Sequence, residues 1–537
     1  MDKVLVVGGR TTGLMMALEL ARRGIPTRCI DKSPGIDPHV RANLLHSRSL
    51  EIFQSLGIAE QVTKGSIEEK GYVFYRDREL IGECLHSPID SPFPYGLSQS
   101  QAHVEATLEK SLNSLNIKVE RQVSLTSIDQ DSNGLSVCMQ HYDGSEEISR
   151  HQWLVACDGA HSTVRHLAGV NFPGEGDDVE YILGDIVMTG DKELEGCKGH
   201  VFFHDNGELF VFTRLPGNRQ FIVATLQGGT SLDREPTLED LQSIVSERAG
   251  SYNLSDPQWL GRFKINYRIA SQYRTDRIFL AGDAAHVHSL LAGIGMNTGI
   301  QDAYNLGWKL ALVASHQASV DILDTYEEER KFIAEDVLNM THGITDTMES
   351  YPGLTQGERD KLISHLFVPE AERLNAARHL QEVDIDYSKS KISLVTDDTF
   401  SGGPAAGSQA PDAEGLIVAG DTTSYFRLPA DKQFRLLLFC NDINEPLSVL
   451  VKQALDKSMR FATWLKPYII VLEQNQAFTD FEKDYAVVID QQGLMHQKYA
   501  AHSSCIYLIR PDGYVAYRSF EIKSVYKYFD HLEYALA

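Results

Sequence analysis

The stretch that decides the fold is residues 3–31, which read KVLVVGGRTTGLMMALELARRGIPTRCID. Its first five residues form an apolar run, and a glycine turn at 8–13 separates that run from apolar residues at helical spacing. Gly24 ends the predicted helix, and a second predicted strand at 26–30 runs into Asp31. Because strand, glycine turn, helix and strand follow in this order, the segment predicts the βαβ unit of a dinucleotide-binding α/β domain.

The glycine turn has the spacing of a phosphate-binding motif, with one departure. Gly8 permits the tight turn, and the helix that follows offers unpaired N–H groups to a pyrophosphate. Asp31 ends the second strand, where an acid accepts hydrogen bonds from ribose hydroxyls. Arg10 occupies the position of the middle glycine in G-x-G-x-x-G. Either its side chain turns outward or pairs with a phosphate, or the site has lost its dinucleotide, and both interpretations stay open here.

The composition is that of a folded protein with several domains. The chain has 537 residues, of which 42% are hydrophobic and 23% are charged, and at ~100–200 residues per domain it would form about three domains. A total of 50 Lys and Arg against 74 Asp and Glu gives a formal net charge of −24. Because this charge repels nucleic-acid phosphates, we expect no nucleic-acid partner.

The cysteines and the apolar runs indicate where in the cell the protein is expected. The 7 cysteines are scattered and contain no C-x-x-C pair, which argues against a disulfide framework and against a zinc cage, so we expect no metal. The N-terminus lacks the pattern of a signal peptide, and no run approaches the ~18 apolar residues of a membrane span. We therefore expect a cytoplasmic protein.

Two later regions predict further domains. Apolar segments at 199–203 (GHVFF) and 209–213 (LFVFT), with turn signals after them, predict hairpins of an inserted antiparallel sheet. Residues 401–411 predict a linker, and predicted strands and helices after it indicate a small α/β domain. Those strands are 434–439, 468–472 and 505–509, and the helices are 446–455 and 521–536. The predicted division is a discontinuous first domain over 1–70, 100–175 and 270–395, a sheet domain over 71–99 and 176–269, and a third domain over 410–537.

Three more segments carry a resemblance to a known family. They read LVACDGAHSTVR at 154–165, RIFLAGDAAH at 277–286 and GIGMNTGIQDAYNL at 293–306. Together with the βαβ unit they resemble the FAD-dependent aromatic hydroxylases, the single-component flavoprotein monooxygenases that include phenol hydroxylases and polyketide hydroxylases. The resemblance covers about residues 1–390. The tail, including the turn RPDG at 510–513, resembles the thioredoxin-like C-terminal domain of the larger members.

The resemblance implies a fold, a cofactor and a reaction. The fold would be a Rossmann-like FAD-binding domain with an inserted antiparallel-sheet substrate domain and a thioredoxin-like domain. NADH or NADPH would reduce FAD, and dioxygen would then hydroxylate a phenolic and, as we expect, polycyclic aromatic substrate through a flavin hydroperoxide. The implied cofactor-binding residues are Gly8, Gly13, Asp31, Lys32, Arg41, Gln101, Asp158, Asp283, Gly295, Met296 and Asn297.

The resemblance also assigns roles along the cofactor. Asp31 would hold the adenosine ribose, while Arg41 and Gln101 would contact the phosphate and ribitol region. Asp158 and Arg165 would support the pyrophosphate and the reductant side. These assignments place the adenosine end of FAD at the βαβ unit.

The flavin end is expected at a helix start and a loop. Asp283 would contact the ribitol, and residues 295–297 would present backbone N–H groups where partial positive charge stabilises reduced flavin. The loop 287–293 reads VHSLLAG, whereas the family usually shows two prolines before a Gly-Gly pair. His288 in this loop is either a proton relay or a packed histidine that does not titrate. No side chain is assigned as the catalyst.

The C-terminal domain and the alternatives complete the predictions. Cys440 stands where a thioredoxin would place C-x-x-C, but a second sulfur is missing, which favours packing or a homodimer over redox chemistry. Because the flavin motifs precede the linker, removal of residues after about 400 is expected to leave flavin binding largely intact while it reduces dimer content or thermal stability. The alternatives are Baeyer–Villiger oxygenation, oxidative inactivation of a polyketide antibiotic, or a redox-silent binding protein that kept the fold.

Overall fold

The computed structural model describes residues 3–39, 42–190, 198–204, 208–226, 234–289, 293–350, 370–394, 400–428, 433–441, 465–473, 485–521 and 528. Arg41, residues 290–292 and the predicted helix 446–455 lie outside these ranges. So does the predicted helix 521–536, except for Glu521 and Tyr528. Within the described ranges, no helix is both long enough and apolar enough to cross a membrane.

The first sheet is six-stranded and mainly parallel, as the N-terminal segment predicts. Its order is β18-β19-β12-β1-β2-β8, and the central strand β1 pairs in parallel with both β2 and β12. The helix α1 (Thr11–Arg22) connects β1 to β2 and completes the predicted βαβ unit. The strands are β1 (Val4–Val7), β2 (Thr27–Asp31), β8 (Val119–Arg121), β12 (Trp153–Ala156), β18 (Arg274–Thr275) and β19 (Ile278–Leu280).

Close contacts between backbones set the geometry of α1. A Cβ on Gly13 would lie 1.8 Å from the carbonyl oxygen of Gly8, so the helix starts directly against the turn. On its other side α1 packs against α7 (Gly295–Ala314), where a Cβ on Gly307 would lie 2.7 Å from the Cβ of Glu19. Glycine at these positions therefore lets the turn and two helices approach more closely than any other residue permits.

The second sheet has eight strands in the order β20-β17-β13-β16-β15-β14-β5-β6. The predicted hairpin segments 199–203 and 209–213 pair in it as antiparallel strands. One pair departs from the predicted antiparallel sheet, because β14 and β5 run in parallel. The strands are β5 (Gly71–Arg76), β6 (Glu79–Leu85), β13 (Gly174–Gly190), β14 (Gly199–Phe203), β15 (Leu209–Leu215), β16 (Arg219–Leu226), β17 (Tyr252–Ile269) and β20 (His286–Val287).

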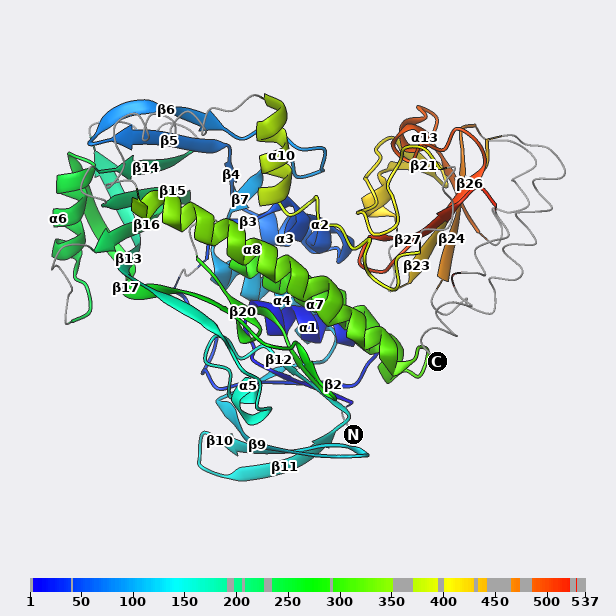
Figure 1. The fold of residues 1–537 in the computed structure, drawn as a ribbon, viewed down its shortest axis with the longest axis horizontal. Helices are drawn as coiled ribbons and strands as arrows, with labels where there is room; N and C mark the ends of the chain where they lie inside the picture. Colours follow the sequence, from blue (N-terminus) through cyan, green and yellow to red (C-terminus); the bar gives the residue numbers. More distant parts are fainter. Residues whose placement is uncertain are drawn as a thin grey trace.

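Smaller elements surround these two sheets (Figure 1). A three-stranded sheet, β9 (Val123–Asp131), β10 (Gly134–His141) and β11 (Glu146–His151), projects at the bottom of that view. A second, β3 (Leu44–Leu45), β7 (Gly96–Ser98) and β4 (Ile67–Glu69), lies near the helix α2. The helices are α2 (Ser47–Ser55), α3 (Ala59–Thr63), α4 (Gln101–Ser114), α5 (Thr163–Leu167), α6 (Leu238–Arg248), α8 (Asp324–Ser350), α10 (Glu370–Leu380) and α13 (Leu494–Lys498).

A C-terminal unit follows, built on a seven-stranded sheet in the order β22-β21-β25-β24-β23-β26-β27. The strands β23, β24 and β25 are parallel, β26 is antiparallel to β23, and β27 is antiparallel to β26. The predicted linker at 401–411 is not a free spacer, because Gly407 and Ala410 donate backbone hydrogen bonds to Val515 and Gly513. The strands are β21 (Leu416–Val418), β22 (Asp421–Thr423), β23 (Phe434–Phe439), β24 (Leu465–Val471), β25 (Ala486–Ile489), β26 (Cys505–Ile509) and β27 (Val515–Ser519).

Candidate functional site

A cavity of about 1040 Å³ lies at the carboxyl ends of the central strands of the first sheet, where α/β folds bind their ligands. Two predicted residues, Gly13 and Asn297, are not among its lining residues, and Arg41 lies outside the described residues. Phe221 of the second sheet contributes to the opposite wall. The predicted residues that line it are Gly8, Asp31, Lys32, Gln101, Asp158, Asp283, Gly295 and Met296.

The glycine turn forms one wall of this cavity. Gly8 has φ +111°, and a Cβ there would lie 2.1 Å from the carbonyl oxygen of Cys157, so glycine is required at that position. Asp31 holds the turn, since its carboxylate accepts the N–H of Gly9. The other oxygen of Asp31 accepts the backbone N–H of Ser33 at 2.6 Å. Asp31 therefore fixes the turn and the loop after β2 at the same time.

Arg10 extends along the cavity wall between two carboxylates. Its Nη1 lies 3.2 Å from Oδ2 of Asp37, and its Nε lies 3.3 Å from Oε1 of Glu105. The third nitrogen, Nη2, is buried and has no hydrogen-bond partner in the described part of the chain. The guanidinium is thus held to one side of the turn, and one N–H group is left for a ligand.

Glu105 is a site residue that the sequence analysis missed. Its Oε1 accepts the N–H of Thr11 at 3.2 Å, at the N-terminus of α1, and the side-chain amide of Gln101 at 2.8 Å. Glu105 is buried, and it lies four residues after Gln101 on one face of α4. Only that i, i+4 spacing links the two residues in the sequence.

Asp158 and Arg165 differ in their positions. Asp158 lines the cavity and accepts the N–H of Val164 at 3.2 Å, and burial raises the pKa of its carboxyl group. Arg165 is buried and does not line the cavity; it donates to the carbonyl oxygens of Ala160 at 2.8 Å and Ala284 at 3.0 Å. Arg165 therefore joins two loops that form the cavity.

Asp283 is exposed, and the loop that carries it is held by a buried acid. Asp302 on α7 accepts the N–H of Gly282 at 3.0 Å and lies 2.7 Å from Nε2 of His286. The Nε of Arg330 on α8 donates to its other oxygen at 2.7 Å. Burial alone would raise the pKa of Asp302, but His286 and Arg330 together outweigh it and lower the pKa to about 2. The sequence analysis gave no role to Asp302, although it lies in the quoted 293–306 segment.

The start of α7 reaches the cavity through Gly295 and Met296. The side chain of Asn297 instead accepts the N–H of His46 at 2.9 Å and donates to the carbonyl oxygen of Leu44 at 2.9 Å. Asn297 therefore anchors the helix start to β3. His288 lines the cavity next to these residues, and burial followed by the neighbouring charge of His286 lowers its pKa to about 4.

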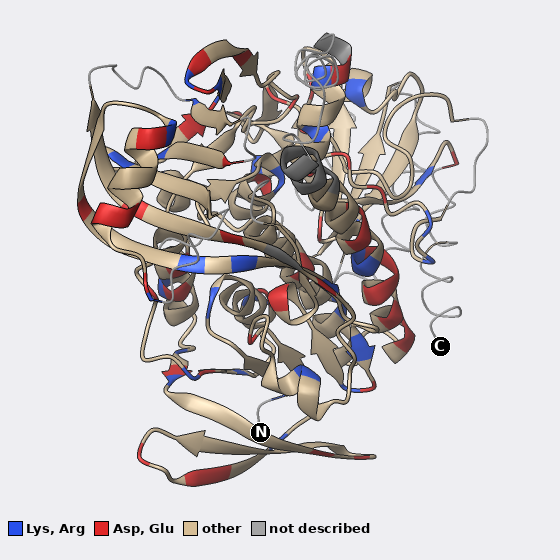
Figure 2. Cartoon of the chain, turned by 60° about the vertical axis from the view of Figure 1, so that its left-hand side comes forward, with Lys and Arg blue, Asp and Glu red and all other residues tan. Residues whose placement is uncertain are grey.

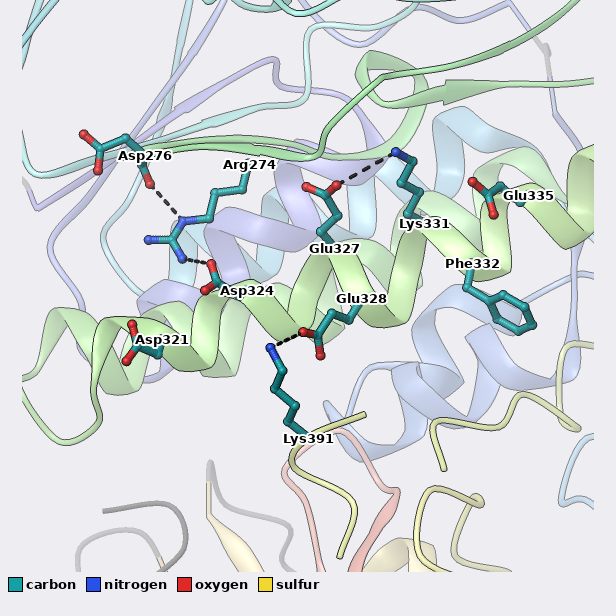
Figure 3. A pocket seen from close by; sticks show the side chains of 10 residues that line it. All are labelled: Arg274, Asp276, Asp321, Asp324, Glu327, Glu328, Lys331, Phe332, Glu335 and Lys391. Carbon is teal, nitrogen blue, oxygen red and sulfur yellow. Dashed lines mark hydrogen bonds and ion pairs between the residues drawn. The ribbon is translucent and has the colours of Figure 1, made fainter. Parts of the chain in front are cut away.

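A second cavity, of about 820 Å³, lies along α8 (Figure 3). This helix carries many Asp and Glu residues (Figure 2). Each of the cavity's three basic residues lies next to an acid of the lining: Lys391 is 2.6 Å from Glu328, Lys331 is 3.9 Å from Glu327, and Arg274 bonds to Asp324. None of the predicted cofactor residues lines it. Among the described residues, moreover, no cluster of His, Cys, Asp and Glu could hold a metal ion. The first cavity is therefore the candidate site.

Several known proteins are similar to this chain in sequence and in fold. The family described as FAD binding domain matches residues 1–341. Pentachlorophenol 4-monooxygenase of Sphingobium chlorophenolicum is 31% identical over 416 residues, 76% of this chain and 76% of that protein. Rifampicin monooxygenase of Streptomyces venezuelae is 36% identical over 359 residues, 66% of this chain and 73% of that protein. The solved structure of the OxyS anhydrotetracycline hydroxylase from Streptomyces rimosus matches with a TM-score of 0.75 and 27% identity, over 96% of this chain and 95% of that one.

Proposed function

Because this chain belongs to the FAD binding domain family and is an FAD-dependent monooxygenase, we propose that it hydroxylates a phenolic, polycyclic aromatic compound in the first cavity. One observation carries the proposal. Motifs from the ends of β1, β2, β12 and β19 converge on this one cavity, together with the N-terminus of α7. The three known proteins compared above act, by their names, on pentachlorophenol, rifampicin and anhydrotetracycline, which supports an aromatic substrate.

The cavity fits the cofactor in its chemistry. Gly8 lines the cavity at the end of β1, and Thr11 and Thr12 at the N-terminus of α1 line it beside Gly8. The buried Nη2 of Arg10 and the buried Oδ1 of Asp158 have no partner in the described residues, and both side chains line the cavity. We therefore propose that the pyrophosphate of FAD lies at this turn, with the adenosine ribose at Asp31.

The predicted roles of the remaining residues follow from this placement. Arg41 and Gln101 would contact the phosphate and ribitol region, Lys32 would also bind the cofactor, and Asp283 would contact the ribitol. The start of α7 at 295–297 would meet the flavin, where the positive end of the helix dipole favours negative charge. Asn297 would contribute through its backbone, since its side chain is engaged with Leu44 and His46.

Bound FAD supplies the redox chemistry, accepting a hydride from NADH or NADPH and activating dioxygen. The protein positions the cofactor and the substrate and excludes water from the site. Arg165 and Asp302 hold the loops that form the cavity, while Phe221 and the second sheet cover it from the substrate side. The lowered pKa keeps His288 neutral near pH 7, so it can accept or donate a hydrogen bond without adding charge.

We further propose the predicted division into a discontinuous FAD-binding domain, a sheet domain and a thioredoxin-like domain over 410–537. The parallel strands β23–β25 flanked by antiparallel β26 and β27 support the last. Cys440 is buried, and burial raises the pKa of its thiol to about 12, which favours packing over redox chemistry. The described cysteines are free thiols, in keeping with a cytoplasmic location. A homodimer stays a prediction.

Product analysis tests the proposed function. The purified protein is incubated with NADH or NADPH under air and a panel of monocyclic and polycyclic phenols. We expect a product with one added ring hydroxyl and consumption of reductant that depends on the phenol. Reductant consumption that yields only hydrogen peroxide with every phenol would contradict the proposal. Conversion of a ketone to an ester or lactone would instead support the Baeyer–Villiger alternative.

A further inference from the structure

The RPDG turn of the C-terminal unit enters the core of the N-terminal part of the molecule. Arg510 donates from Nη1 to Oε1 of Glu329 at 2.7 Å and from Nη2 to Oε2 at 2.8 Å, a bidentate pair with α8. Asp512 accepts the Nε of Arg510 at 2.9 Å and the indole N–H of Trp308, on α7, at 3.0 Å. All four residues are buried. The contact is therefore a core contact between charged groups, and each partner depends on the others for hydrogen bonds.

Further contacts seat this turn on three helices. The main-chain carbonyl oxygen of Asp512 accepts a hydrogen bond at 2.6 Å from Arg48 of α2. Tyr304 of α7 donates to the carbonyl oxygen of Pro511 at 3.2 Å. Lys309, also on α7, donates to Glu329 at 2.8 Å, so the buried cluster holds two basic and two acidic groups. Loss of the guanidinium alone would leave a surplus negative charge in the core.

The same cluster reaches the cofactor loop through the next residue of α8. Arg330 donates to Asp302, the residue that holds the N–H of Gly282 and the ring of His286. Arg330 also donates to the hydroxyl of Tyr387 at 2.9 Å. The ring of Tyr387 lies 4.4 Å from that of Tyr514, directly after the RPDG turn. Two continuous routes, one through α8 and one through Tyr387, thus connect the C-terminal turn to the loop that carries Asp283.

We propose that Arg510 is a positioning residue for the cofactor site. By fixing α8 and Tyr387, it keeps Arg330 against Asp302 and so holds the loop 282–286 in the form that binds FAD. The C-terminal unit would then be a required part of the cofactor site, contrary to the separable tail that the sequence predicts. The inference rests on the proposed position of FAD, because it assumes that this loop contacts the cofactor.

The test is FAD affinity in the full-length protein. Apo-protein is titrated with FAD for wild type, Arg510→Gln and Arg510→Lys, each shown to be folded by circular dichroism at the titration temperature. We expect Arg510→Gln to raise the dissociation constant at least tenfold, and Arg510→Lys to raise it less, because lysine keeps the charge but loses the bidentate geometry. The matched control is Arg518→Gln, because Arg518 donates to linker carbonyl oxygens at 402–404 and does not line the first cavity. It should leave the dissociation constant unchanged.

Asp283→Ala separates the two ways of failing. If Asp283→Ala weakens FAD binding and both Arg510 variants bind like wild type, the position of FAD stands and the role of Arg510 is overturned. If Asp283→Ala also binds FAD like wild type, FAD lies elsewhere, and both the proposed site and the role of Arg510 are wrong.

A measurement on the wild-type protein does not depend on how the variants fold. Because coupling between two sites is reciprocal, FAD binding should slow amide hydrogen exchange in 505–519. Unchanged exchange in this segment would overturn the proposal.

Discussion

Arg10 is the residue at which this chain departs most clearly from a dinucleotide motif. Its guanidinium pairs with the buried Glu105 and with Asp37, and without it two negative charges beside the glycine turn would lose this partner. We therefore expect Arg10→Gly to weaken FAD binding, although the substitution restores the motif. Loss of a charge-assisted hydrogen bond contributes about 1.5–3 kcal/mol, or roughly ten- to hundredfold in the dissociation constant.

Titration at two salt concentrations checks this expectation. The FAD affinity of Arg10→Gly should depend less on salt than that of wild type, because the charge interaction of the guanidinium with FAD, which salt screens, is absent. Arg28→Gln is the control, because Arg28 pairs with Glu120 and Glu147 and does not line the cavity. Tighter binding by Arg10→Gly would mean that the side chain only obstructs the turn.

His288 predicts a pH dependence of stability. Its pKa is about 4 in the folded protein, against about 6.5 in an unfolded chain, so the unfolded state binds more protons between these values. The free energy of unfolding should therefore fall as the pH is lowered from about 6.5 to 4. In His288→Gln the free energy of unfolding should fall less over this pH range, as measured by urea unfolding at several pH values. Identical pH profiles for the two proteins would show that His288 titrates normally.

At the scale of elements, the contact between α1 and α7 joins the two helices whose N-termini line the first cavity. Gly307→Ala adds a methyl group 2.7 Å from the Cβ of Glu19, so the two helices must move apart. We expect the free energy of unfolding to fall by about 1–3 kcal/mol despite the better helix propensity of alanine. The control is Gly295→Ala, where the nearest atom to the new methyl group is 3.5 Å away, on the side chain of His288. Equal stability of both apo-variants would contradict the close packing.

The elements themselves were largely predictable from the sequence, but their pairing partners were not. The βαβ unit and the strands 434–439 and 505–509 follow from apolar periodicity and turn residues, which are local signals. The bond from Thr11 to Glu105 spans 94 residues, and the pair of Arg510 with Glu329 spans 181. Local periodicity contains no information about such partners. The cofactor residues came from motif resemblance, whereas Glu105, Asp302 and Arg330 are visible only in the folded chain.

At the scale of the whole molecule, the C-terminal unit and the N-terminal part share a core. Removal of residues 401–537 would expose Trp308 and leave Lys309 and Glu329 without Arg510 and Asp512. We expect the truncated protein to lose several degrees or more in melting temperature and to retain less FAD. Thermal unfolding with and without FAD measures both effects. A truncated protein with the melting temperature and the FAD affinity of wild type would show that the shared core contributes neither to stability nor to FAD binding.

The order of strands in the first sheet has a consequence for protein synthesis. The strand β12 at the centre is flanked by β1, made at the start of the chain, and by β19 at 278–280. At ~5–20 residues per second, a ribosome needs roughly 6–24 s to go from the end of β12 to the start of β19. The edge of this sheet on which β19 adds stays open during that time, exposing backbone groups to other nascent chains. The protein therefore completes its first sheet only when about half of its 537 residues have been made, and high expression rates should increase its demand for chaperones.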